Sequence, residues 1–560
     1  MSTTARIGWA ALIVATLYVC YFSHLGAIGF VGPDEPRYAW VARAMVESGD
    51  WVTPRLYGKP WFEKPPLYYW GAAICFELFG VNEAAARLPS AISALLATLA
   101  LAWLAWRVYG GETARWLLLL LPTTVGMIGF SHAAATDMPF SGMLTLAMVC
   151  AAVIVGLVPE ESRDGEQHAA PLPKTRVARR RSVALILFGF FLGLAVLAKG
   201  PAAIILCGGA VFFWVVFTKR WRDGVRLLHP VGIAASCITA LPWYVHCARR
   251  NPDFFRVFII EHNFKRFLTP EFQHIQAFWF YVPVLLIAFL PWTSALVWTA
   301  SAAAFQMYKD RLHHGTSFLL SWSLFCVLFF SISQSKLPGY VLPAVPAIAA
   351  LLSYSCTYSP VLKARSFGVT LLVVAFLFLT LAIWVWQSGE RPLGKLVAFE
   401  PVAALVLILL ALFGILLASG FLVVGSEKRF LFLFSGVLCL ILPLALAGRI
   451  LKRTPVGILS ADYLARQIRN AQIRIEDLKI SAIKRDTRFG LDFYLHTELS
   501  DWDRDPHREV YVLAEGQLPC RQQPKEMLCT DLWDQDRIDA FRLLHLVPRG
   551  LSVAGGGKVK

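Results

Sequence analysis

Acidic, basic and aromatic side chains gather where apolar segments of the sequence end. Asp34, Arg37 and Tyr38 follow the first apolar run, and Glu63 and Lys64 lie further along the same polar stretch. A charged side chain at the edge of a bilayer is costly to keep there and is typical of a functional site. These residues are therefore the first candidates for chemistry.

Further candidates lie at the ends of later apolar runs. Each has a carboxylate, ammonium, guanidinium, imidazole or phenol group close to such a run. They are Asp137, Lys199, His262, Arg266, His274, Lys336 and Tyr340. Together with the first group they come from six separate segments of the chain, which we expect to meet at one membrane surface.

This combination of side chains suits the transfer of a sugar from a phosphate. A carboxylate, above all Asp34 or Asp137, can act as a general base or stabilise positive charge at an anomeric carbon. Lysine and arginine can hold a departing phosphate. Aromatic rings offer faces for sugars, and the spans offer a groove for a lipid tail. Because no nucleotide sugar is present outside the cytoplasm, a donor there must be membrane-borne.

Several of these residues also have structural interpretations. Asp34 lies just before a helix-starting proline and Asp137 before Met-Pro, and both patterns are typical of helix caps. Lys64, Lys199 and Lys336 could be interfacial anchors whose ammonium groups reach the bilayer surface.

Metal binding is a further possibility at two places. Glu63 and His262 could share a divalent cation, but two ligands are a weak signal and hydrogen-bonded structural roles are the alternative. The run from Asp501 to Asp503 contains the Asp-x-Asp pattern that nucleotide-sugar enzymes use for a metal. It lies in a polar tail without a nucleotide-binding fold, so we expect a surface turn there.

The elements that must position these residues are membrane spans. The 560 residues are 57% hydrophobic and 16% charged, with a mean hydropathy of +0.56, whereas soluble domains carry about 25% charged residues. We expect a mainly α, polytopic membrane protein with about 13 spans. They are 6–28, 88–108, 115–131, 138–158, 182–198, 202–218, 229–247, 277–303, 317–333, 340–356, 366–387, 400–421 and 430–449.

An odd number of spans places the termini on opposite sides of the membrane. With the N-terminus inside, the basic loops 159–181, 219–228 and 425–429 are cytoplasmic, as the positive-inside rule requires. The loops 29–87 and 248–276 then lie outside. Within the first of them we expect short amphipathic helices at 36–48 and 66–79.

The sequence divides into residues 1–449, the transmembrane domain, and residues 450–560, a polar tail. The tail has the pattern of a small extracytoplasmic α/β domain, with a helix near 459–472 and strands at 479–485 and 508–514. Cys520 and Cys529 lie in this tail and could form a disulfide outside the cytoplasm.

The net charge of +16 indicates contact with anionic membrane lipids. No zinc finger, basic helix or RNA motif supports nucleic-acid binding, so we expect no nucleic-acid partner.

The order of the motifs resembles one known family. Pro-Asp-Glu-Pro-Arg-Tyr-Ala (33–39), Trp-Phe-Glu-Lys-Pro-Pro-Leu (61–67), Ala-Thr-Asp-Met (135–138), Leu-Ala-Lys-Gly-Pro (197–201), Glu-His-Asn-Phe-Lys-Arg-Phe (261–267) and Ser-Lys-Leu-Pro-Gly-Tyr (335–340) are similar to segments of the bacterial 4-amino-4-deoxy-L-arabinose transferases. These belong to a superfamily of membrane glycosyltransferases, with the GT-C fold, that includes the protein O-mannosyltransferases.

The resemblance implies the GT-C fold with a C-terminal α/β domain, in the bacterial inner membrane with the active site facing the periplasm. It implies a monomeric, inverting enzyme that moves a sugar from undecaprenyl phosphate to lipid A or another envelope acceptor. By position, Asp34 and Asp137 match required acids, Lys64 a contact to the lipid phosphate, and Arg266 and Tyr340 phosphate or substrate contacts. Two alternatives stay open: a protein O-mannosyltransferase-like enzyme, and a transporter or flippase.

Overall fold

The structure is a computed structural model of the chain. It describes residues 3–159, 174–265, 267, 275–297, 314–358, 461–503, 508–515, 527–532 and 541–548, with isolated positions between 372 and 441. The predicted spans 366–387, 400–421 and 430–449, the boundary at 449–450, and the residues Arg266, His274 and Cys520 lie outside this part of the chain. Cys529 lies within it and is disulfide-bonded.

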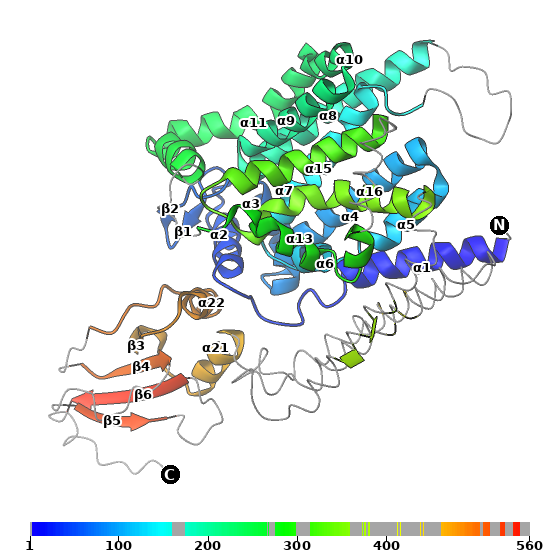
Figure 1. Ribbon diagram of the computed structural model, residues 1–560. Coiled ribbons are helices and arrows are strands. Elements are labelled where there is room, and N and C mark those ends of the chain that lie inside the picture. Colours follow the sequence, from blue (N-terminus) through cyan, green and yellow to red (C-terminus); the bar gives the residue numbers. More distant parts are fainter. Residues whose placement is uncertain are drawn as a thin grey trace.

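The first part of the chain forms a helical bundle with a structured loop (Figure 1). The chain enters through α1 (Thr3–Tyr21). The first loop contains α2 (Asp34–Ser48), the strands β1 (Arg55–Leu56) and β2 (Lys59–Pro60), and α3 (Leu67–Phe79). The predicted helices 36–48 and 66–79 are thus confirmed as α2 and α3.

The bundle continues through helices that pack side by side. They are α4 (Glu83–Tyr109), α5 (Gly111–Leu120), α6 (Val125–Ser131), α7 (Asp137–Ile154), α8 (Lys174–Lys199), α9 (Ala202–Thr218), α10 (Trp221–Val225), η1 (Arg226–Leu228), α11 (Pro230–Arg250), η2 (Arg256–Lys265), η4 (Phe278–Phe280), α13 (Tyr281–Ala288), α15 (His314–Ile332), η5 (Pro338–Ala344) and α16 (Val345–Tyr358).

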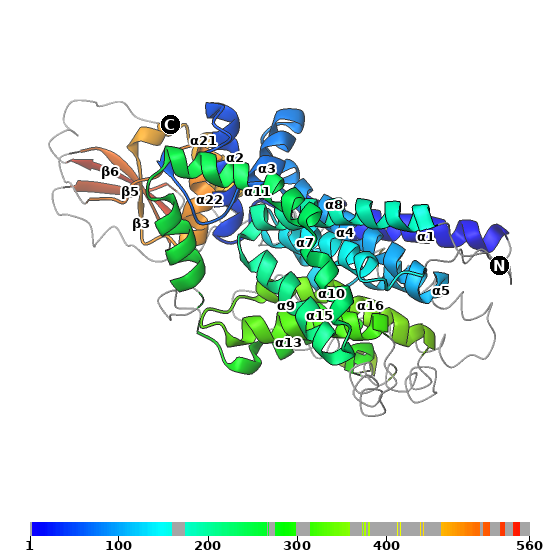
Figure 2. The ribbon, with the colours of Figure 1, turned by 90° about the horizontal axis from the view of Figure 1, so that it is seen from above.

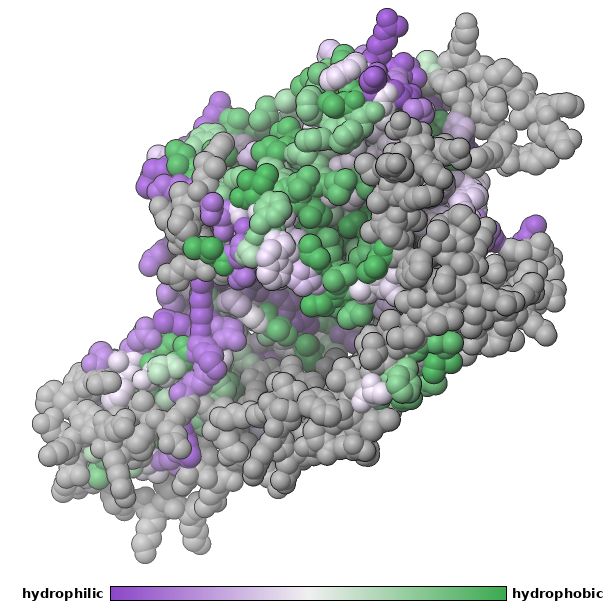
Figure 3. Space-filling view, viewed as in Figure 1, coloured by the Kyte–Doolittle hydropathy of each residue, from purple (hydrophilic) through white to green (hydrophobic). Residues whose placement is uncertain are grey.

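Six of the described helices are long and apolar enough to cross a membrane, or seven if a bent pair counts as one span. They bear out the predicted multi-pass architecture, although the predicted number of 13 goes beyond the described residues. Apolar side chains are exposed to the surroundings over α9 and α15 (Figure 3), as expected for a surface that faces lipid.

Two predicted spans are wrong as continuous helices. The segment 115–131 is split into α5 and α6, which bend by 62° at a break around Pro122. The segment 277–303 is interrupted after α13, where Pro291 lies in a turn. Proline has no backbone N–H to donate and disfavours the helical conformation of the residue before it, so an apolar run can hold a break that hydropathy does not reveal.

Close helix contacts in the bundle rely on small residues. α8 packs along α11, and a Cβ built at Gly189 would come within 2.1 Å of the carbonyl oxygen of Gly232. Without side chains at these positions the two backbones approach each other directly, as is typical of membrane helices. This contact fixes the end of α8, which carries Lys199.

The C-terminal part forms a separate α/β unit. It consists of α21 (Ala461–Asn470), η7 (Ile475–Asp477), β3 (Leu478–Ser481), α22 (Arg485–Leu495), β4 (Val510–Glu515), β5 (Met527–Asp531) and β6 (Phe541–Pro548). The strand order is β3-β4-β6-β5, with β3 and β4 parallel and the other pairs antiparallel. Apolar residues of α21 and α22 pack on one face of this sheet.

The predicted helix near 459–472 and the predicted strand at 508–514 are confirmed as α21 and β4. The predicted strand at 479–485 is wrong in its second half. It ends at Ser481, and α22 begins at Arg485. Figure 2 shows that this unit and the first loop lie together at one end of the bundle, away from the N-terminus.

Candidate active site

The first candidate residue, Asp34, lies at the start of α2. Helix α2 begins at Asp34 itself, its N-cap residue is Pro33, and no side chain caps it. The alternative that Asp34 is only a helix cap is therefore wrong. Its carboxylate is instead ion-paired with Arg37, one turn further along α2, and its side chain stays 52% exposed.

Arg37 connects Asp34 to Glu63, the other candidate acid of the first loop. Its Nε donates to the carbonyl oxygen of Pro33 at 2.9 Å, and one terminal nitrogen lies 3.4 Å from Glu63 Oε2. Lys64 Nζ in turn lies 3.4 Å from Glu63 Oε1. The four side chains alternate in charge from Asp34 to Lys64, so each lies beside a group of opposite charge.

The Arg37 guanidinium is firmly charged although its side chain is only 6% exposed. Burial is the largest influence and lowers its pKa, but the carboxylates of Glu63 and Asp34 raise the pKa by more, so that the net direction is upward. Tyr38, which is buried beside it, has a pKa well above the ordinary range, because of burial and then the charge of Glu63. Tyr38 therefore stays a neutral phenol.

A second pair of candidates meets at the ends of α7 and α8. Lys199 Nζ lies 2.6 Å from Asp137 Oδ1, and the same nitrogen lies 5.2 Å from the ring centre of Tyr340. Gly339 is required here, because a Cβ at this position would come within 2.6 Å of Asp137 Oδ1. Asp137 is thus the counterion of Lys199.

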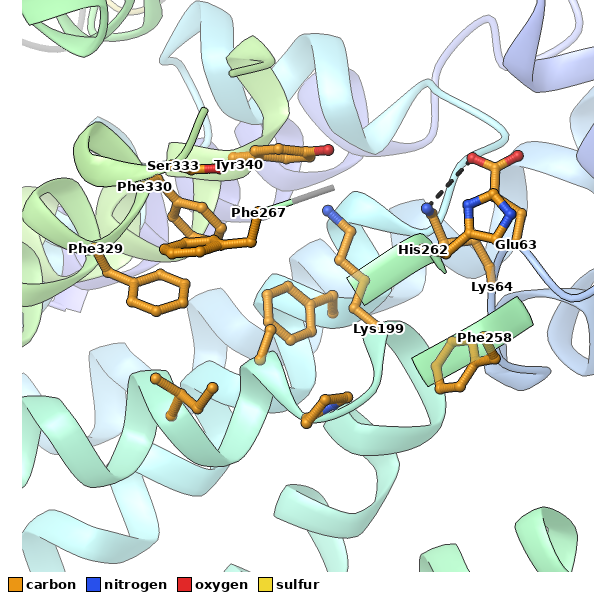
Figure 4. Close-up of a pocket in the computed structure, with 14 residues that line it drawn as sticks. Glu63, Lys64, Lys199, Phe258, His262, Phe267, Phe329, Phe330, Ser333 and Tyr340 are labelled. Atoms are coloured by element: carbon orange, nitrogen blue, oxygen red, sulfur yellow. Dashed lines mark hydrogen bonds and ion pairs between the residues drawn. The ribbon is translucent and has the colours of Figure 1, made fainter. Parts of the chain in front are cut away.

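Lys199 and Tyr340 line a cavity of about 370 Å³, whereas Asp34, Arg37 and Asp137 are not among the residues that line it. Figure 4 shows the side chain of Lys199 reaching into it from α8, with Glu63, Lys64 and His262 on one side and Phe329, Phe330 and Tyr340 on the other. The remaining lining is largely apolar and comes from α7, α9, η2 and residues just outside the helices: Phe140, Pro201, Ala202, Ile205, Phe258, Phe267 and Ser333. Two ammonium groups thus face a space whose walls include five phenylalanines.

A second cavity, of about 510 Å³, shares Glu63 and His262 with the first. Its other lining includes Arg250, Asp253 and Arg256, so it is more polar. The two cavities therefore meet at the end of the charged network.

Glu63 and His262, the two residues of the metal prediction, both line the two cavities. Among the described residues, no group of three or more His, Cys, Asp or Glu side chains could hold a metal ion. A cation at these two residues stays a prediction.

Lys336 is predicted to contact a lipid phosphate, but in the structure it binds the protein backbone. Its Nζ donates to the backbone carbonyls of Gln276 and Ser333 at 3.0 and 2.6 Å, and the residue is 7% exposed. It ties two chain segments together and is not among the residues that line the cavity. Asp501, the first acid of the Asp-x-Asp pattern, pairs with Arg488 at 3.1 Å on the surface of the C-terminal unit.

Sequence reasoning missed the phenylalanines of the cavity and one arginine. Phe329 and Phe330 lie in an apolar run whose period gives no sign that they face a cavity. Arg87 lies in α4 and binds Glu35 at 2.7 Å. A lone arginine near the start of an apolar span was the available signal, because such a charge needs a partner.

The fold and the site together define a class of protein: a multi-pass membrane protein with the GT-C fold. The crystal structure of ArnT from Cupriavidus metallidurans bound to undecaprenyl phosphate has a TM-score of 0.75 to this chain at 23% identity, and the match covers 99% of this chain and 100% of that one. The model of the dolichyl-phosphate-mannose-protein mannosyltransferase family matches residues 9–258.

Curated relatives narrow the class. Undecaprenyl phosphate-α-4-amino-4-deoxy-L-arabinose arabinosyl transferases of Serratia proteamaculans (strain 568) and Pseudomonas fluorescens (strain Pf0-1) are each 30% identical to this chain, over 75% and 73% of its length and 73% and 71% of theirs. The enzyme of Edwardsiella ictaluri (strain 93-146) is 32% identical over 62% of this chain, and the match spans 59% of that protein. The chain belongs to the family of undecaprenyl phosphate-α-4-amino-4-deoxy-L-arabinose arabinosyl transferases.

Proposed function

We propose that this protein is an inverting glycosyltransferase that moves 4-amino-4-deoxy-L-arabinose from undecaprenyl phosphate to lipid A or a related envelope glycolipid. The observation that carries the proposal is the cavity in which Lys64 and Lys199 face phenylalanine walls beside the Asp34–Arg37–Glu63 network. An anionic headgroup on a long apolar chain matches that combination of side chains. The names of the relatives supply the sugar and the lipid carrier.

The reaction is a single displacement. An acceptor oxygen attacks the anomeric carbon as the bond between that carbon and the phosphate oxygen breaks, and undecaprenyl phosphate leaves with the bonding electron pair. Asp34 orients the acceptor or takes its proton. Lys64, with Lys199 and Arg266, neutralises the phosphate as it departs. The second cavity, lined by Arg250 and Arg256, is open to an acceptor that carries negative charge.

The site is proposed to face the periplasm of the inner membrane. Helix α8 runs from Lys174 to Lys199 and α9 from Ala202 to Thr218. At 1.5 Å per residue, the 26 residues of α8 span about 39 Å. The first residues of α8 and the basic residues Lys219 and Arg220 after α9 therefore lie far from the cavity along these helices, which supports a cytoplasmic position for the two basic loops.

The function is tested by incubating the purified protein in detergent with undecaprenyl-phosphate-linked radiolabelled 4-amino-4-deoxy-L-arabinose and lipid A. Labelled lipid A, with inversion at the anomeric carbon, is the expected product. Because no compartments exist in detergent, a transporter gives no product. The second candidate is a protein O-mannosyltransferase-like enzyme, because the model of that family matches residues 9–258. Such an enzyme labels a protein acceptor from a mannosyl donor instead. An arm with EDTA tests the cation predicted at Glu63 and His262: loss of transfer that added Mg²⁺ or Mn²⁺ restores supports it.

A further inference from the structure

The C-terminal unit docks on the first loop through one face of α22. Phe489 and Phe493 lie four residues apart in α22 and so share that face, and His496 follows as the C-cap residue of the helix. Phe493 is 4% exposed, and its ring lies edge-on to Phe30 at 4.8 Å. His496 Nε2 lies 3.2 Å from Glu47 Oε2 at the end of α2. The face of α22 is therefore packed along α2.

Buried hydrogen bonds fix this contact. The hydroxyl of Tyr494 accepts from the backbone N–H of Phe30 at 2.9 Å and donates to Glu83 Oε1 at 2.8 Å. The hydroxyl of Tyr57 donates to Asp492 Oδ2 at 2.7 Å. Because several directional bonds act together with the packed rings, α22 is held in one position relative to α2.

This position brings Phe489 against Arg37. The Arg37 Cζ lies 5.2 Å from the ring centre of Phe489, 5.7 Å from that of Trp61 and 5.9 Å from that of Tyr38. Phe489 is thus the nearest of three rings around the guanidinium, and the C-terminal unit contributes it. Arg37 bonds to Asp34, to Glu63 and to the Pro33 carbonyl. A movement of the Arg37 guanidinium therefore changes its ion pair with the exposed carboxylate of Asp34.

We propose that Phe489 is a positioning residue for the transfer reaction, and that through it the C-terminal unit sets the orientation of Asp34. The ring attracts the cation and completes an enclosure in which the Arg37 guanidinium has one arrangement. Without it, Arg37 gains alternative rotamers and Asp34 is no longer held toward the acceptor. This inference rests on the proposed function.

The test compares three variants in the detergent transfer assay. Phe489→Leu keeps the apolar bulk and removes the aromatic face. We expect kcat to fall about tenfold, as expected for the loss of a partly desolvated cation–π contact, with the KM for the lipid-linked donor unchanged. Phe489→Tyr keeps the face and is expected to restore kcat.

Phe493→Leu is the matched control. Phe493 lies one turn along the same face, and its ring contacts Arg43 at 5.9 Å. Arg43 pairs with Glu47 outside the cavity network. We expect this variant to lower the melting temperature by loosening the contact between α22 and α2, with kcat close to that of the wild type.

The outcomes separate the two proposals. A wild-type protein without transferase activity refutes the proposed function, and the role of Phe489 with it. If the wild type is active, a Phe489→Leu variant with wild-type kcat overturns the positioning role alone. An equal fall of kcat in Phe489→Leu and Phe493→Leu that follows the fall in melting temperature also overturns it, because the effect is then one of docking.

Discussion

Two acids that are neighbours in the sequence stand in opposite surroundings. Glu35 is 6% exposed. Its carboxylate accepts two hydrogen bonds from Arg87, at 2.9 and 2.7 Å, one from the N–H of Val31 at 2.7 Å and one from the N–H of Ala134 at 2.6 Å. Asp34 is 52% exposed in its side chain and pairs with Arg37. The Glu35 carboxylate is surrounded by hydrogen-bond donors of the protein, whereas the Asp34 carboxylate is partly open to solvent.

The difference indicates that Glu35 holds the structure together, whereas Asp34 is available for chemistry. Arg87 also donates to the carbonyl oxygens of Leu25, Ile28 and Gly29, so the Glu35–Arg87 pair ties the chain after α1 to α2 and α4. A buried pair whose hydrogen bonds are all made holds segments in place, and breaking it leaves a buried charge. A half-exposed carboxylate can still meet a substrate.

The largest effect is expected from Asp34→Asn. The amide cannot act as a base or carry the negative charge, so kcat for sugar transfer should fall by about 10²–10⁴-fold. The melting temperature should stay close to that of the wild type, because Asp34 is half exposed. The radiolabel assay and thermal unfolding in detergent measure the two quantities. Transfer at the wild-type rate would rule out the role of Asp34 in the chemistry.

The next effect is on folding and comes from Arg87→Met. Removing the guanidinium leaves Glu35 buried without its counterion, which typically costs about 3–5 kcal/mol. We expect a much lower melting temperature or loss of protein from the membrane. Glu47→Gln is the control on the same helix as Glu35. It weakens the more exposed contacts of Glu47 with Arg43 and His496, each of which is worth about 1 kcal/mol or less. Equal losses of stability in Arg87→Met and Glu47→Gln would contradict the distinction between the buried pair and the exposed contacts.

A smaller effect, with a pH dependence, is expected at Asp492. Burial raises the pKa of Asp492 to about 6 from an ordinary value of 3.8, although the Leu499 N–H, the Tyr57 hydroxyl and Arg488 act in the opposite direction and Glu498 adds a little to the rise. Between these two values the folded protein binds more protons than the unfolded chain, so the free energy of unfolding falls as the pH rises through this window. The slope is at most about 1.4 kcal/mol per pH unit.

The contact between α22 and the first loop should therefore be more stable at pH 5 than at pH 7. Thermal unfolding of the wild type and of Asp492→Asn at both pH values measures this. The variant keeps a side chain of the same shape but does not titrate, so its stability should change less between the two pH values. An equal change in both proteins would show that Asp492 is not the group responsible.

The sequence by itself determined the membrane class and the helices of the first loop, and it predicted that Glu63, Lys64, Lys199, His262 and Tyr340 meet at one membrane surface. Hydropathy and the distribution of basic residues are local properties of the chain. They decide which loops share a side of the membrane and hence which charged residues can meet.

The tertiary structure alone decided how those charges are paired and used. Asp34 pairs with Arg37, Glu35 with Arg87 and Asp137 with Lys199, and the ammonium of Lys336 donates to two backbone carbonyls. The tertiary structure also brought Phe489 from the C-terminal unit against Arg37. Such pairings depend on packing between segments that are far apart in the chain. No residue spacing distinguishes an acid that is buried and fully hydrogen-bonded from its neighbour whose carboxylate stays half exposed.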